Sequence, residues 1–162
     1  MSEATTQLNS SDQEQVEARR LHLLATLDKA IAPGRAALAL TEVGLTHLDL
    51  AVAIEANPRT TATWLEGDLP VVKKNIHKQR IRELKEVTRF IVADGTIALQ
   101  EADWLRDPHR AAEFVTPLEL IGQGRWKEAG RLYGSDVSAK APSIFQEDRQ
   151  EQQASRTETS QR

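Results

Sequence analysis

The sequence has no cysteine and one methionine among its 162 residues. Disulfides and thiolate metal sites are therefore excluded. Aromatic residues make up only 4% of the chain while hydrophobic residues make up 40%, so a core must be built mainly from Leu, Ile, Val and Ala. The net charge of -3 gives no global attraction to nucleic acid. No apolar run approaches the ~18 residues of a membrane-spanning helix.

The first fifteen residues, MSEATTQLNSSDQEQ, are polar and acidic, the opposite of a signal peptide. We therefore expect a cytoplasmic protein, with one domain or one domain plus tails for this length. Catalysis is not expected. No histidine belongs to an HExxH pattern or to an i, i+4 histidine pair. His109 lies near Asp107 and Glu113, but the residues around it are typical of packing, so we predict no enzyme activity, no metal and no cofactor.

Helical spacing dominates the chain and predicts an all-α fold. Residues 1–10 are polar and predicted to be disordered. A helix is expected from Ser11, with Glu14 at the capping-box offset, to Pro33-Gly34. Its narrow apolar stripe is Val16, Arg20, Leu23, Leu24, Leu27 and Ile31. Two interpretations stay open: a helix packed on the main body, or a helix for dimerisation or partner binding.

Residues 35–67 predict three short helices. The first is apolar and ends near Gly44. Thr46 begins the second, with Asp49 at the capping-box offset, and Asn57-Pro58 begins the third, which is expected to end at Gly67. The inward-facing residues of the last two are predicted to be Leu48, Leu50, Ala51, Ile54, Thr61, Trp64 and Leu65. Two short helices joined by a tight turn are the sequence form of a DNA-binding helix-turn-helix.

The outward face of the third helix supplies the candidate DNA contacts Arg59, Thr60 and Thr63. Arg59 is the best reader of guanine or phosphate among them, whereas Glu66 and Asp68 would repel the DNA backbone. Active DNA binding and a helix-turn-helix kept only as scaffold or dimer support are both open.

A long helix is predicted within residues 70–95 and ends at Asp94-Gly95. Its buried stripe is expected to be Ile76, Ile81, Leu84, Val87 and Ile91. The one basic cluster of the chain is Lys73, Lys74, Lys78, Arg80, Arg82, Lys85 and Arg89. Lys73 and Lys74 are candidates for clamping DNA phosphates; the alternative is a solvated helix face. A further short helix is expected over 97–105, with Ile97, Leu99, Ala102 and Leu105.

The stretch from Trp104 to Tyr133 is dense in helix signals. Thr116 can cap a helix with Pro117 in its first turn and Glu119 at the capping-box offset. Gly122 and Gly124 end that helix. The next helix carries Trp126, Ala129, Leu132 and Tyr133 on one face, and Gly134 is expected to end it. Large apolar anchors on a compact helical unit suit packing or partner binding better than chemistry.

A family resemblance rests on these residues. Trp104-Leu105, Asp107-Pro108, the run from Thr116 to Ile121, Gly124-Arg125, Glu128 and Leu132 stand in the order seen in the toxin-binding domain of the Xre/MbcA/ParS antitoxin family. The run from Asp49 to Ala51, the run from Asn57 to Thr60, and Trp64 resemble the Xre-type helix-turn-helix that precedes that domain. Both halves occur here in the family's order.

The resemblance implies the antitoxin of a type II toxin–antitoxin module. Its partner would be a RES-domain toxin, an enzyme that consumes NAD, neutralised by direct binding of the Trp104–Tyr133 unit. The expected toxin contacts are Trp104, Arg125, Trp126 and Arg131, although Trp126 is equally well explained as core. The helix-turn-helix would repress the module's own promoter by binding operator DNA as a homodimer or a larger assembly.

Two alternatives remain open: a stand-alone transcription regulator that uses the C-terminal domain for oligomerisation, and an adaptor with a silent helix-turn-helix. The tail is polar with a single apolar pair, Ile144-Phe145, and is interpreted as featureless in preference to an anchor that orders on binding. The expected divisions are a disordered N-terminus (1–10), an N-terminal helix (11–34), a helix-turn-helix region with linking helix (35–95), a toxin-binding domain (96–134) and a flexible tail (135–162).

Overall fold

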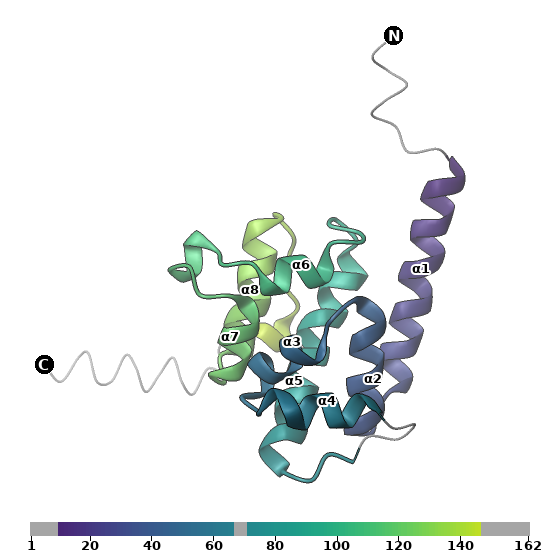
Figure 1. Ribbon diagram of the computed structural model, residues 1–162. Coiled ribbons are helices and arrows are strands. Elements are labelled where there is room, and N and C mark those ends of the chain that lie inside the picture. Colours follow the sequence, from purple (N-terminus) through teal and green to yellow (C-terminus); the bar gives the residue numbers. More distant parts are fainter. Residues whose placement is uncertain (1–9, 67–70, 147–162) are drawn as a thin grey trace, which may run out of the picture.

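The computed structural model describes residues 10–66 and 71–146, and every regular element in these two ranges is helical (Figure 1). The all-α prediction is therefore confirmed. The elements are α1 (Ser10–Lys29), α2 (Pro33–Val43), α3 (His47–Ile54), α4 (Pro58–Glu66), α5 (Asn75–Asp94), α6 (Glu101–Arg106), η2 (Arg110–Ala112), α7 (Pro117–Gly122), α8 (Trp126–Asp136) and η3 (Ser143–Phe145). The predictions made for residues 1–9, for Gly67 and Asp68, and for the tail from 147 lie outside the described residues.

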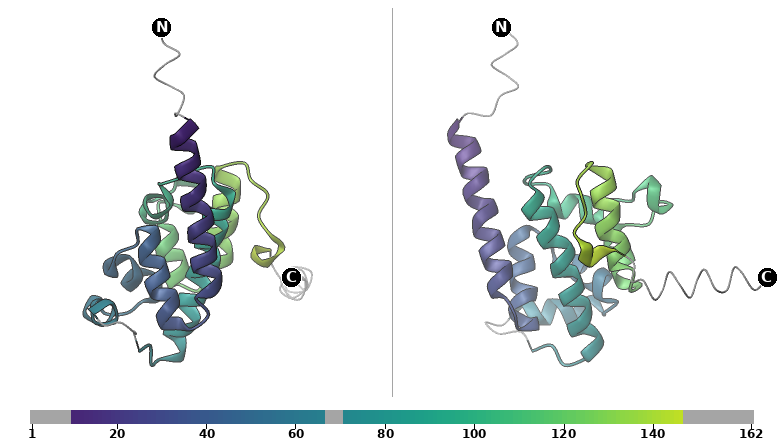
Figure 2. Two further views of the ribbon diagram at one scale, coloured as in Figure 1. Left: turned by 90° about the vertical axis from the view of Figure 1, so that its right-hand side faces the viewer. Right: turned by 180° about the vertical axis from the view of Figure 1, so that it is seen from behind.

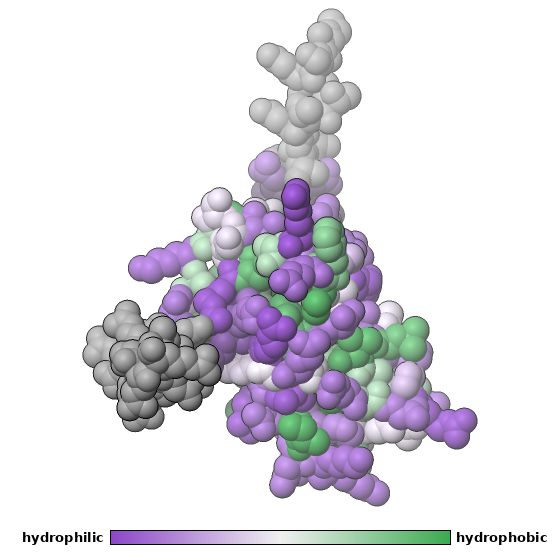
Figure 3. Space-filling view, turned by 90° about the vertical axis from the view of Figure 1, so that its left-hand side faces the viewer, coloured by the Kyte–Doolittle hydropathy of each residue, from purple (hydrophilic) through white to green (hydrophobic). Residues whose placement is uncertain are grey.

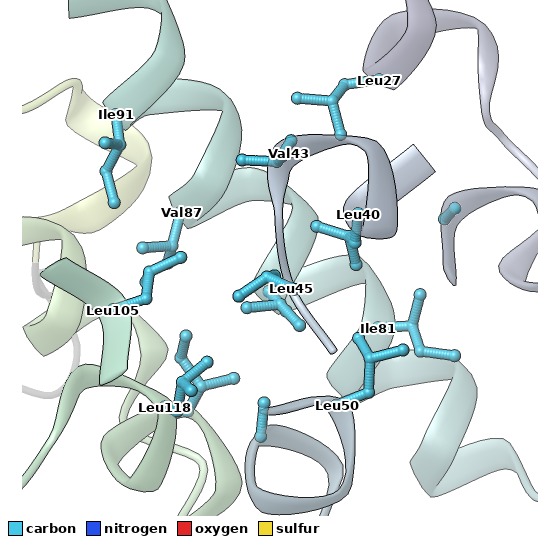
Figure 4. Close-up of a cluster of buried hydrophobic side chains, with 14 of the residues drawn as sticks. Leu27, Leu40, Val43, Leu45, Leu50, Ile81, Val87, Ile91, Leu105 and Leu118 are labelled. Atoms are coloured by element: carbon cyan, nitrogen blue, oxygen red, sulfur yellow. The ribbon is translucent and has the colours of Figure 1, made fainter. Parts of the chain in front are cut away.

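The long helix α5 is the centre of the fold. It contacts α1, α2, α3, α6, α7 and α8, and Figure 2 shows these helices grouped around it. Figure 4 shows the core that results, with side chains from α1, α2, α5, α6 and α7 pointing into one cluster. Regions 35–95 and 96–134 therefore share one hydrophobic core. None of the helices in the described ranges has the length and apolar character needed to cross a membrane.

The first helix differs from its predicted bounds. α1 already includes Ser11, so Ser11 and Glu14 form no capping box there. It ends at Lys29, and Pro33 is the first residue of α2 because proline suits a first helical turn. The second half of α1 packs on α2 and α5. Its first turns extend past the bundle (Figures 1 and 2). The predicted stripe residue Ile31 lies beyond the helix and is 84% exposed.

Several predicted helix boundaries are confirmed by the hydrogen bonds that make them. Gly44 ends α2 with φ +115°, and Thr46 and Asp49 form the predicted capping box of α3. Asn57 Oδ1 accepts from the Arg59 amide at 2.9 Å at the start of α4. Gly95 ends α5. These signals act within one helical turn, so the sequence alone is sufficient to predict them.

Other predictions are wrong where the tertiary neighbours decide. Leu48 on α3 is 54% exposed and Ile76 on α5 is 48% exposed, so neither belongs to a buried stripe. The helix expected over 97–105 begins only at Glu101, since Leu99 has a φ of +71° and lies in a turn. Ile97 still packs against the core.

The C-terminal unit follows its predicted pattern up to α8. Thr116 Oγ1 accepts from the Glu119 amide at 3.1 Å at the start of α7. α7 ends at Gly122, and Gly124 follows with φ +82°. The predicted end at Gly134 is wrong, because α8 continues to Asp136. The chain then turns back at Ser138, and we call residues 137–146 the C-terminal strap.

Candidate functional site

The first candidate surface is the pair α3 and α4. Residues 55–57 join the two helices, and Glu55 takes the left-handed conformation with φ +56°. Thr61 Oγ1 on α4 donates to His47 O on α3 at 2.7 Å. Trp64 is 6% exposed and makes an edge contact with His77 of α5, with ring centroids 5.7 Å apart. α4 is thus fixed to both neighbours through its inward face.

The outward face of α4 carries the candidate DNA contacts. Arg59 and Thr63 are exposed, and Thr60 is half-buried. Thr63 Oγ1 donates to Arg59 O at 2.8 Å, so it is engaged with its own helix. Lys73 and Lys74 are exposed immediately before α5. The structure therefore leaves four of these five predicted residues exposed.

The residues of the predicted basic cluster make contacts with different parts of the protein. Arg80 Nη1 pairs with Glu83 of its own helix at 2.8 Å. Lys85 Nζ donates to Ala30 O at 3.0 Å, and Arg89 pairs with an aspartate of α1. Lys85 and Arg89 hold α5 against the N-terminal part of the chain, so the cluster is not one continuous DNA-facing patch.

The second candidate surface lies on the C-terminal unit, and its predicted contact Trp104 proves to be a core residue. Trp104 is 7% exposed, and its Nε1–H donates to Asp136 Oδ2 at 2.8 Å. Its ring makes an edge contact with Tyr133 at 5.0 Å between centroids. The prediction of Trp104 as a direct contact is corrected here: its side chain links α6 to α8.

Tyr133 connects α8 to the end of α5. Its hydroxyl donates to Asp94 Oδ2 at 2.7 Å, and its side chain is fully buried. Burial raises the pKa of Tyr133 above its ordinary value, and the hydrogen bond to Asp94 raises it further. The phenol therefore stays protonated and keeps its role as donor.

The other three predicted contacts lie along α8 with different exposure. Arg125 is exposed and pairs with Glu128, Nη2 to Oε1 at 2.7 Å. Trp126 is half-buried. Arg131 Nη1 donates to the backbone oxygen of Phe145 and so holds the strap. Of these three residues, Arg125 is the exposed one, and Trp126 and Arg131 are each half-buried.

Phe145 has an anchoring role, whereas the sequence favours a featureless tail over an anchor at Ile144-Phe145. Its side chain is 1% exposed, packs against the Phe90 ring in a tilted arrangement and makes an edge contact with Trp126, at centroid distances of 5.4 and 5.7 Å. Gly130 makes this possible, because a Cβ there would lie 2.2 Å from the Phe145 ring. The interpretation of a featureless tail does not hold for residues 135–146. The glycines at 130 and 134 on one face of α8 are the signal that points to a chain packed there.

Two contacts join these surfaces. Arg106 Nη2 on α6 lies 2.8 Å from Asp49 Oδ2 at the start of α3. At the other end of α3, Gly122 approaches so closely that a Cβ there would lie 2.5 Å from Val52 O. α3 is therefore held at both ends by the C-terminal unit.

The fold and its two surfaces define a small all-helical protein built for contacts. No group of three potential metal-binding side chains occurs within ranges 10–66 and 71–146.

The chain is 29% identical over 111 residues to the mycobacterial cidal antitoxin MbcA of Mycobacterium tuberculosis and Mycobacterium bovis, a match that covers 66% of this chain and 88% of MbcA. A probable mycobacterial cidal antitoxin of Mycobacterium tuberculosis is 23% identical over 106 residues, covering 65% and 88%.

No family model matches the chain, and no solved structure matches it at a significant level. The antitoxin relatives nevertheless confirm the kinship that the sequence indicates. This protein is a homologue of the MbcA-type antitoxins.

Proposed function

We propose that this protein is the antitoxin of a type II toxin–antitoxin module and that it neutralises a RES-domain, NAD-consuming toxin by direct binding. The kinship with MbcA carries this proposal, since the match covers 88% of that antitoxin. The RES class of the toxin follows from the resemblance of the Trp104–Tyr133 unit to the family's toxin-binding domain. The protein needs no cofactor for this role.

The exposed start of α8 suits direct contact with the toxin. Arg125 and Trp126 lie side by side there, and arginine and tryptophan are enriched among the residues that dominate binding energy. Trp104 and Arg131 stabilise the position of this surface through contacts with neighbouring segments. Trp104 fixes α8 through Asp136, and Arg131 fixes the strap that covers one side of Trp126.

We further propose that α3 and α4 form a helix-turn-helix through which the protein represses its own promoter. The exposed Arg59 and Thr63, with Thr60, would read or contact the DNA, and the exposed Lys73 and Lys74 would contact phosphates. A homodimer on a palindromic operator is the arrangement that such a motif favours. Residues 35–95 and 96–134 share one hydrophobic core. In this proposal they differ in function, with DNA binding in the first range and toxin binding in the second.

The decisive experiment is co-expression with the protein encoded by the adjacent gene. A stable complex in a pull-down, together with suppressed NAD loss, is expected. Arg125→Ala should weaken the complex, and Lys140→Ala, at an exposed charge in the strap, should not. An adjacent protein without NAD-consuming activity, or no complex with the wild type, would overturn the antitoxin proposal and favour the stand-alone regulator.

A further inference from the structure

The loop between α6 and α7 presents an unusual side chain. All seven aromatic residues of the chain lie in the described ranges, and Phe114 is the one that is exposed, at 69%. In Figures 1 and 2 this loop, which contains η2, projects from the helix bundle. We call residues 107–115 the Phe114 loop.

The backbone of this loop is strained. Glu113 and Phe114 follow each other in the left-handed region with φ of +55° and +66°. Residues with a side chain avoid this region, and a bulky residue there is an outlier. Strain of this kind persists only where the surrounding structure enforces it, and it is concentrated at functional segments.

The surrounding structure does enforce it. His109 O accepts from the amides of Phe114 at 2.9 Å and Ala112 at 3.0 Å. His109 itself lies on the core tryptophan, with its ring 4.6 Å from the Trp104 ring and its Nε2 3.0 Å from Trp104 O. The loop is therefore anchored at its base and presents Phe114 in a fixed position, which reduces the entropy cost of binding through it.

The loop is electrostatically coupled to the start of α8. Hydrogen bonding with Glu128 raises the pKa of Arg125, and the charge of Glu113 raises it further, so Glu113 acts on that guanidinium. Glu113, which precedes Phe114 in the chain, is thus close enough to the start of α8 for its charge to act on Arg125. Arg110 is also exposed in the loop. An apolar centre with charged residues around it is the usual anatomy of a protein interface.

We propose that Phe114 is an aromatic anchor that enters an apolar pocket of the toxin, with Arg110, Glu113 and Arg125 as the polar rim. This inference rests on the proposed antitoxin function and extends it to a loop outside α7 and α8. Figure 3 shows that hydrophobic residues on one face of the molecule lie in separate patches among polar ones. A single anchor with a charged rim suits such a surface better than a broad apolar contact.

A toxin is favoured as the occupant because the proteins that this chain matches over 88% of their length are antitoxins. Two cavities on the described residues have linings that mix charged and apolar side chains. One, of about 380 Å³, includes Arg19 and Val92, and the other, of about 270 Å³, includes Lys29 and Leu38. Docking of Phe114 into a second copy of this chain is therefore kept as an outcome of the test.

The test is the affinity of purified variants for the RES-domain protein encoded beside this chain's gene, used in a catalytically inactive form. Phe114→Ala should bind about 10- to 100-fold more weakly. Phe114→Asn should behave alike, since asparagine tolerates the left-handed backbone and removes only the ring. Leu99→Ala is the matched control: Leu99 is 60% exposed with φ +71°, in a different loop. It should bind within about twofold of the wild type.

The outcomes separate the two proposals. If the wild type does not bind the toxin, the antitoxin function and this inference both fail. If the wild type binds and both Phe114 variants bind equally well with unchanged melting temperatures, only the inference fails. If the variants abolish self-association of the free protein and leave toxin affinity unchanged, a second copy occupies the loop and the inference is overturned.

Discussion

Arg106 and Asp49 join the C-terminal unit to the start of α3 through a hydrogen-bonded ion pair. Arg106 Nη2 lies 2.8 Å from Asp49 Oδ2 and 3.1 Å from Gly44 O. The same Asp49 carboxylate accepts from the Thr46 amide at 2.8 Å as part of the capping box. The Asp49 carboxylate therefore takes part in capping α3 and also binds Arg106 of α6. The orientation of the proposed DNA-binding helices thus depends on a residue of the C-terminal unit.

This pair predicts a specific pH dependence of stability. Burial raises the pKa of Asp49, but hydrogen bonds from Arg106 and Thr46 outweigh burial and hold the pKa below its ordinary value of 3.8. Because the folded-state pKa is depressed, the pair stabilises the fold above the unfolded-state pKa, and this contribution is lost as the pH falls through the folded-state pKa. Arg106→Ala should lower the free energy of unfolding by about 1–3 kcal/mol at pH 7.

The difference between wild type and Arg106→Ala should narrow below about pH 4, measured by urea denaturation at several pH values. Asp103→Asn is the control, since Asp103 is the other carboxylate paired with Arg106 but its side chain is 66% exposed. Its effect should stay within about 0.5 kcal/mol. A difference that is constant from pH 7 to pH 3 would contradict the assignment to Asp49.

Gly122→Ala should destabilise the protein by about 1–3 kcal/mol through overpacking. The added Cβ would meet the backbone oxygen of Val52 at 2.5 Å, and a backbone atom cannot move aside without shifting α3. Gln123→Ala, at an exposed neighbouring position, should change stability by less than about 0.5 kcal/mol. Thermal and urea unfolding measure both. Equal free energies of unfolding for the two variants would contradict the prediction, because they would show that the close approach of α7 to α3 at Gly122 does not limit stability.

The strap should detach when its anchor is removed. Phe145 is 1% exposed and Ile144 is 45% exposed, so the two neighbours form a matched pair. Phe145→Ala should speed proteolysis within residues 137–146 while Ile144→Ala leaves it near the wild-type rate. Limited proteolysis with mass spectrometry locates the cut. Gly130→Ala should reproduce the Phe145 effect, because its Cβ would occupy the ring's position. A strap that stays protected in both variants would mean that Arg131 alone holds it.

The features that the sequence predicts well are those decided by adjacent residues. Thr46, Gly44, Thr116 and Gly95 act on backbone groups within one turn, and the sequence predicts the position of each correctly. Wrong predictions arise where a distant segment decides. Gly134 has the sequence signature of a helix end, but it serves the close approach of the strap, where a Cβ would lie 2.9 Å from Ala139 O.

In the candidate site, too, the sequence predicts what adjacent residues decide and does not predict what distant segments decide. Helical spacing correctly places Arg59 and Thr63 on the outside of α4. It cannot reveal that Trp104 is buried by Tyr133 and Asp136, because those residues lie about thirty positions along the chain. The exposure of Phe114 likewise depends on a loop conformation with two left-handed residues, which no local pattern in the sequence favours.

If α4 reads DNA, Arg59→Ala should weaken binding to a promoter fragment by about 1–3 kcal/mol and reduce discrimination against scrambled DNA. Arg59 is exposed at the first turn of α4, and truncating its side chain leaves the backbone contact with Asn57 intact. Fluorescence anisotropy with both DNA sequences measures the two effects. Equal affinity of wild type and variant for the promoter would remove Arg59 from the interface.

The two lysines before α5 should act differently from Arg59. Lys73→Ala with Lys74→Ala should weaken binding to promoter and scrambled DNA by the same factor, because phosphate contacts carry no sequence information. The slope of log K against log salt should become shallower by about 0.9 for each phosphate that the variant no longer neutralises. Lys140→Ala, which removes an exposed positive charge from the strap, is the control and should leave the slope unchanged. If the double variant keeps the wild-type slope, these lysines belong to a solvated surface, and any DNA binding depends on α4 alone.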